Sequence, residues 1–153
     1  MYRFFHWAIF AYLISLPLLL ISCDSSENIY PVVVEHHPEI EQALLKAKQK
    51  PHAVIIIFGA DWCPPCRQLD KILDQIDVKN DLQPLYEMVK IDTGHWDKNI
   101  DTAKKYGNPI RQGIPGIVLL NQDGTIREII ESNDLSSLIK GGPDVLTLYL
   151  QES

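Results

Sequence analysis

Residues 53–66 read AVIIIFGADWCPPC, and the rest of the chain is most easily understood from this stretch. Ala53 to Phe58 is an apolar, largely β-branched run without polar alternation, which predicts a central strand buried on both faces. Cys63 and Cys66 follow at the start of a predicted helix that runs to about Ile76. The positions of this helix expected to face inward are Leu69, Ile72, Leu73 and Ile76.

Two thiols separated by two residues at a helix N-terminus can close a small disulfide. Unpaired backbone N–H groups and the helix dipole favour the thiolate of the first cysteine. Thiolate is the species that attacks a disulfide, so Cys63 is the predicted nucleophile and Cys66, one turn further in, the predicted resolving thiol. Pro64 and Pro65 stiffen the loop by fixing two φ angles, but they carry no N–H to donate to the sulfur. Whether the two prolines together stabilise or destabilise the Cys63 thiolate stays open.

Three other uses of the two cysteines have to be considered. One CxxC is half of a zinc site, but no second CxxC or matched Cys/His pair follows in this chain of three cysteines. A structural disulfide is possible, although a solvent-facing bond at a helix start is poorly placed as a staple. A cysteine hydrolase needs a positioned histidine, and the sequence places none of the five. We therefore expect no metal and no cofactor beyond a redox-active Cys63–Cys66 disulfide.

The remaining patterns predict a small α/β domain. The order is β-α-β-α-β-α-β-β-α, in which parallel crossovers precede a terminal hairpin, so a mixed sheet between helices is expected. Helix 38–50 would turn Ile40, Ala43, Leu44 and Ala47 inward. The hairpin is expected around Asp123-Gly124, and the last helix, from Pro143, with Val145, Leu146 and Tyr149 inward. The other predicted elements are strands at 29–34, 85–91, 117–121 and 125–131, and a helix at 97–106.

A second signal lies 49 residues after Cys66, in Gly113-Ile114-Pro115-Gly116. A proline opening a strand cannot donate to the ladder and needs a special role. The strand–CxxC–helix unit followed by Ile-Pro and an Asp-Gly hairpin resembles the thioredoxin family over residues 35–153. That resemblance implies a three-layer α/β sandwich with a mixed central sheet and a cis peptide bond before Pro115, facing the cysteines. It also implies substrate binding by Trp62, Ile114 and Pro115, with the Ile114 backbone pairing with an extended substrate chain.

The sequence departs from that family at the groups that handle protons. Thioredoxins carry a buried acid where this chain has Ile57, and a lysine on the next strand where it has Met88. The aromatic residue usually found three residues before the motif's tryptophan is Gly59. Asp61 stands beside the motif, and one hypothesis is that it, or water, carries the proton of the resolving cysteine.

The first 22 residues form a separate composition class. They hold one cation, Arg3, and no acid, and an apolar run from Trp7 to Ile21 is too short for a typical membrane span. Leu20-Ile21-Ser22-Cys23 resembles the lipobox of bacterial lipoproteins, which implies a signal peptide at 1–22, a lipid on Cys23 and a tether at 23–34. An uncleaved signal anchor is the main alternative, and a buried helix a weaker one. Both the lipoprotein and the signal anchor would place the domain on the periplasmic side of a bacterial inner membrane.

The net charge of −6 argues against a nucleic-acid partner, since no basic patch can neutralise phosphates. We expect a thiol–disulfide oxidoreductase whose partners are protein thiols and disulfides, with a membrane electron donor possible. Ile114 before the proline is the reductase-like choice by resemblance. Two alternatives remain at this stage: a non-catalytic binding module of the same fold, and a copper-handling thiol protein using a histidine such as His95.

Overall fold

The computed structural model describes residues 29–30, 37–50 and 52–153. The predicted strand at 29–34, the signal and tether segments and Cys23 therefore lie largely outside the described residues. Of that predicted strand only Ile29 and Tyr30 are described, and they form a bend. In chain order the elements are α1 (Pro38–Gln49), β1 (Ala53–Gly59), α2 (Pro64–Leu73), α3 (Ile76–Leu82), β2 (Tyr86–Asp92), α4 (Ile100–Lys105), β3 (Gly116–Leu120), β4 (Ile126–Ile130), α5 (Ser132–Gly141) and α6 (Pro143–Glu152).

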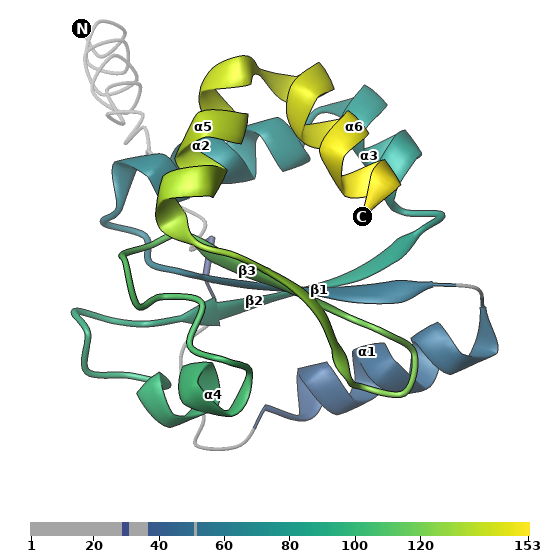
Figure 1. Ribbon diagram of the computed structural model, residues 1–153, viewed down its shortest axis with the longest axis horizontal. Coiled ribbons are helices and arrows are strands. Elements are labelled where there is room, and N and C mark those ends of the chain that lie inside the picture. Colours follow the sequence, from purple (N-terminus) through teal and green to yellow (C-terminus); the bar gives the residue numbers. More distant parts are fainter. Residues whose placement is uncertain (1–28, 31–36, 51) are drawn as a thin grey trace, which may run out of the picture.

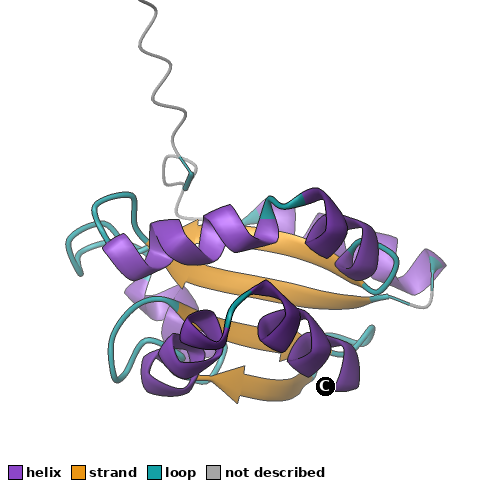
Figure 2. Ribbon diagram, turned by 90° about the horizontal axis from the view of Figure 1, so that it is seen from above, coloured by secondary structure: helices purple, strands orange, loops and turns teal. Residues whose placement is uncertain are grey.

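The sheet has the order β2-β1-β3-β4, with β1 parallel to β2 and antiparallel to β3, and β4 antiparallel to β3. Helices α2, α3, α5 and α6 cover one face and α1 and α4 the other (Figure 1). Figure 2 shows the first group laid over the strands from above. The predicted α/β sandwich with a mixed central sheet is confirmed.

Strand β1 forms the centre of the core. All seven of its residues are buried, as the unbroken apolar run predicted, because both of its faces are covered by helices. Val54, Ile56 and Phe58 pack into one apolar cluster, which also contains both cysteines, and Ile55 and Ile57 pack into the other. The dithiol at the end of β1 is thus attached to a strand that is buried along its whole length.

The helices after the motif differ from the prediction. α2 ends at Leu73, and Ile76 begins a separate helix and is 68% exposed, so the expectation that Ile76 faces inward is wrong. The chain turns at Asp74 and Gln75, after which Val78 and Leu82 supply the buried positions of α3. Helix α5 was also not predicted. Its buried Leu135 and Ile139 stand four residues apart, which is the helical period.

Two further helices differ from the prediction: α4 in its first residue, and α6, which begins at Pro143 as predicted, in one inward position. α4 begins at Ile100 rather than Asp97, because Asn99 has a positive φ angle of 56°, in the left-handed region, and forms the N-cap. On α6 the buried residues include Leu146 and Leu150, while Val145 is 45% exposed. Among the described residues, no helix is both long enough and apolar enough to cross a membrane.

Candidate active site

Cys63 and Cys66 are joined by a disulfide bond at the N-terminus of α2. The chain leaves β1 at Gly59 and turns tightly, with the Cys63 amide donating to the Ala60 carbonyl oxygen at 3.1 Å. Cys63 is the N-cap of α2, and its Sγ accepts a hydrogen bond from the Cys66 amide at 3.2 Å. This contact would stabilise a Cys63 thiolate, since the donor is one of the unpaired N–H groups of the first helical turn.

Pro64 and Pro65 occupy the first turn of α2 and are exposed. A proline costs little there, because the amides of the first turn have no partner within the helix. The two rings leave the Cys66 amide as the donor to the Cys63 sulfur. The disulfide itself is covered: Cys63 is 3% exposed and Cys66 0%. The expectation of a solvent-facing bond is therefore wrong for this oxidised form, because the loop before β3 lies against the sulfur.

That loop carries Ile114 and Pro115, and the peptide bond between them is cis. The Ile114 carbonyl oxygen lies 3.7 Å from Cys63 Sγ and accepts a hydrogen bond from Ser132 Oγ at 3.3 Å. At Gly116 the backbone passes so close to the chain at Pro109 that a Cβ would stand 2.5 Å from the Pro109 carbonyl oxygen. The structure therefore brings together the four residues that the sequence placed in two distant motifs: Cys63, Cys66, Ile114 and Pro115.

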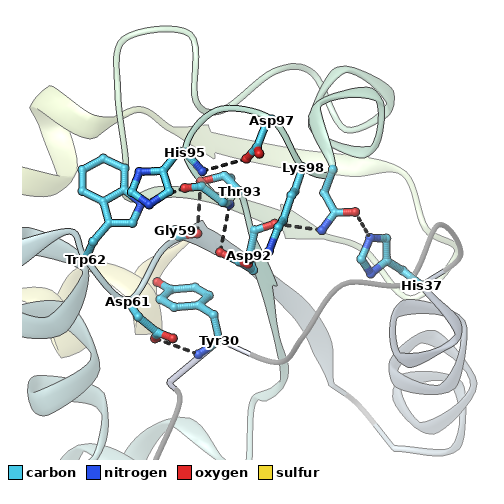
Figure 3. A network of polar contacts seen from close by, with 12 residues as sticks. Tyr30, His37, Gly59, Asp61, Trp62, Asp92, Thr93, His95, Asp97 and Lys98 are labelled. Carbon is cyan, nitrogen blue, oxygen red and sulfur yellow. Dashed lines mark hydrogen bonds and ion pairs between the residues drawn. The ribbon is translucent and has the colours of Figure 1, made fainter. Parts of the chain in front are cut away.

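Trp62 borders the disulfide and is 43% exposed. Its Nε1 donates to the Gly94 carbonyl oxygen at 2.7 Å, and its ring stacks on His95 with the centroids 5.3 Å apart and the planes at 6° (Figure 3). Trp96, next along the chain, is 48% exposed. The loop between β2 and α4 thus extends the aromatic surface around Trp62. The stack of His95 on Trp62 could not be predicted from sequence, because the two residues come from different loops.

The part of the chain that the structure describes contains no cluster of three or more His, Cys, Asp or Glu side chains able to hold a metal ion. His95, the histidine considered for copper, stacks face to face on Trp62. Among the residues that the structure describes, the copper-handling alternative is therefore left without a three-residue ligand group.

An acidic and a basic side chain lie close to the positions where the expected pair is missing. Ile57 of β1 is 1% exposed and lies in register beside Lys90 of β2. Lys90 Nζ forms an ion pair with Asp70, which stands one helical turn after Cys66 on α2. The sequence did not single out this pair, because its two members come from elements whose relative register is unknown before folding.

The Asp61 carboxylate accepts hydrogen bonds from the segment that precedes α1. Its Oδ1 accepts hydrogen bonds from the amides of Ile29 and Tyr30, at 3.0 and 3.2 Å (Figure 3). Its backbone carbonyl oxygen accepts from Arg67 Nη1 at 2.8 Å. The carboxylate therefore holds a segment 31 and 32 residues away in sequence in place, a contact that depends on the finished fold.

Tyr30 is the second residue that sequence reasoning missed. It is 3% exposed and belongs to the same apolar cluster as both cysteines. Burial, and then the carboxylates of Asp70, Asp61 and Asp92, raise the pKa of Tyr30 above its ordinary value. A signal existed in the sequence: Gly59 leaves empty the place where the resembling family has an aromatic residue.

Comparison with known proteins agrees with this geometry. The family model described as Thioredoxin-like matches residues 35–122. A thioredoxin of Buchnera aphidicola subsp. Baizongia pistaciae is 32% identical over 111 residues, covering 72% of this chain and 88% of its own. The chain belongs to the thioredoxin-like family.

Two further relatives show the range of the likeness. The crystal structure of a disulphide isomerase from Xylella fastidiosa Temecula1 superposes with a TM-score of 0.75 at 30% identity, covering 81% of this chain and 95% of that one. A thioredoxin-like protein of Fusarium culmorum is 29% identical over 72 residues, 47% of this chain and 57% of that protein. This family member is accordingly a thiol–disulfide oxidoreductase with a disulfide-forming pair at Cys63 and Cys66.

Proposed function

We propose that this thioredoxin-like protein is a reductase of protein disulfides that works on the export side of a bacterial inner membrane, held there by a lipid on Cys23. The observation that carries the redox part is the Cys63–Cys66 pair at the N-terminus of α2, facing the cis Ile114–Pro115 bond. The apolar segment 1–22 and the Leu20-Ile21-Ser22-Cys23 sequence support the location.

The reaction begins from the reduced dithiol. The Cys63 thiolate attacks one sulfur of a substrate disulfide, a mixed disulfide forms, and the other substrate sulfur leaves as a thiolate that takes up a proton. Cys66, deprotonated, then attacks Cys63 Sγ, which closes the Cys63–Cys66 bond and releases the second substrate thiol. Two electrons pass to the substrate, and a membrane dithiol donor must return two electrons before the next cycle.

The exposed Trp62 and the Ile114–Pro115 loop supply a substrate platform. An extended substrate segment can lie against the Ile114 backbone while the Trp62 ring covers its apolar side chains. The likeness to a disulphide isomerase at 30% identity favours isomerase support as a second activity. Isomerisation starts from the same reduced Cys63, so both activities need a reduced pair.

Trapping tests the catalytic proposal. The Cys66→Ser variant of the full chain, expressed in bacterial cells, should accumulate mixed disulfides through Cys63, because the release step needs the second thiol. Acid quenching followed by mass spectrometry identifies the partners. The matched control is the Cys63→Ser/Cys66→Ser double variant, which should trap nothing. If the folded, exported single variant also trapped nothing, the chain would instead be a binding module of this fold.

The direction of electron flow is tested by the redox state in cells. A reductase should hold Cys63 and Cys66 largely as thiols, and alkylation after acid quenching measures that fraction. The wild-type protein should also reduce insulin in the presence of a small dithiol. A pair found fully oxidised in growing cells would reverse the proposed direction and identify an oxidase.

A further inference from the structure

Tyr30 reaches the redox site from a segment that precedes α1. Its ring occupies the space above Gly59, the last residue of β1. A Cβ built on Gly59 would stand 2.1 Å from the Tyr30 phenol oxygen and 3.1 Å from Cys66 Sγ. The phenol oxygen and the resolving sulfur are therefore neighbours across a glycine that leaves room for both. Figure 3 shows the Tyr30 ring directed toward this strand end.

The position of Tyr30 is fixed from the domain side. Asp61 Oδ1 accepts hydrogen bonds from the amides of Ile29 and Tyr30, and Asp61 itself lies in the turn between β1 and Cys63. The bend at Ile29 and Tyr30 is thus hydrogen-bonded to the turn that leads into Cys63. With 3% of its surface exposed, Tyr30 also shields the Cys66 side of the disulfide from water.

The opening of the disulfide creates charge at Cys66. When a donor thiolate attacks Cys63 Sγ, the donor–Cys63 bond forms, the Cys63–Cys66 bond breaks and the electron pair remains on Cys66. A buried thiolate needs a hydrogen-bond donor, because burial in apolar surroundings penalises charge. Ile57 supplies none where the resembling family has an acid.

We propose that Tyr30 is the hydrogen-bond donor that stabilises the Cys66 thiolate while the disulfide opens or closes. Burial, and then the carboxylates of Asp70, Asp61 and Asp92, raise the pKa of Tyr30, so the phenol stays protonated and able to donate. The proposal rests on thiol–disulfide exchange at Cys63 and Cys66 and applies to either direction of electron flow. The first described residues of the chain thus form part of the redox site.

The test compares Tyr30→Phe with the wild type in the full-length protein in detergent. Phenylalanine keeps the shielding ring and removes only the hydroxyl. Excess dithiothreitol should open the Cys63–Cys66 bond roughly tenfold more slowly in the variant, because a poorer leaving group leaves more slowly. In a Cys63→Ser background, Tyr30→Phe should raise the pKa of Cys66 by about one unit, measured from its ¹³Cβ shift against pH.

The control is Tyr106→Phe, since Tyr106 packs at the margin of the same apolar cluster. It should leave both the opening rate and the Cys66 pKa unchanged. Equal effects in the two variants, or a Tyr30→Phe rate within twofold of the wild type, overturn the proposal. A protein that fails to reduce insulin yet shows the Tyr30 effect with dithiothreitol would lose the proposed function and keep this inference.

Three further variants test the placement of Tyr30 while keeping its hydroxyl. Gly59→Ala would force the phenol aside, because the added Cβ overlaps its oxygen, and should slow opening as Tyr30→Phe does. Asp61→Ala removes the acceptor for two amides and should act similarly, whereas Asp61→Asn keeps an acceptor oxygen and should restore the rate. Wild-type rates in both Gly59→Ala and Asp61→Ala would contradict the assignment.

Discussion

At the scale of single residues, the Asp70–Lys90 ion pair between α2 and β2 shows what the sequence leaves hidden. Ile57 and Met88 correctly indicated that the acid and lysine of the resembling family are missing from their usual positions. Asp70 and Lys90 lie nearby instead, because Lys90 falls beside Ile57 in the β1–β2 register. The motif residues could be predicted, since their spacing is local. The Asp70–Lys90 ion pair joins two elements whose relative position is set only by folding. The packing of Tyr30 on Gly59 depends on the finished fold in the same way.

Lys90→Met should destabilise the protein by about 1–2 kcal/mol, because Asp70 is left as a charge without its partner. The Asp70 side chain is 12% exposed, so water replaces only part of the lost interaction. Urea unfolding measures the change. The double variant Lys90→Met/Asp70→Leu should recover most of the loss, and a double variant less stable than either single one would contradict this account.

At the scale of elements, the strand–dithiol–helix unit, α1 and the terminal hairpin could be predicted because each has its own periodicity or turn signal. Two helices could not. α3 continues directly from α2 in sequence, and only the break at Asp74 and Gln75 separates them. α5 follows β4 without a glycine or proline boundary, so the sequence gives no clear start for the helix that buries Leu135 and Ile139.

Leu135→Ala should cost about 2–5 kcal/mol, because Leu135 is fully buried in the cluster beneath α2, α5 and α6 and its removal leaves a cavity. The matched control is Leu138→Ala on the same helix, where the side chain is only partly buried and the loss should be clearly smaller. Denaturant unfolding of both variants checks the order, and a reversed order would contradict the packing described for α5.

At the scale of the whole molecule, the open question is where the domain is held. The sequence points to lipidation at Cys23, which lies outside the described residues. We expect the mature protein to begin at Cys23 and to carry an acyl mass on that residue. Cys23→Ser should lose the acyl mass. Mass spectrometry of the membrane fraction distinguishes the cases, and a wild-type protein that keeps Met1 would identify an uncleaved anchor instead.

The hydrogen bonds of Ile29 and Tyr30 to Asp61 also determine where a label or fusion partner can be attached. The chain enters the domain at its redox end, whereas Ser153 lies near Arg127 and the β3–β4 hairpin, at the opposite end of the strands. A fluorophore or fusion partner inserted just before Ile29 would crowd the substrate platform and compete with incoming proteins. One joined after Ser153 would leave it open, so reporters for this protein belong at the carboxyl end.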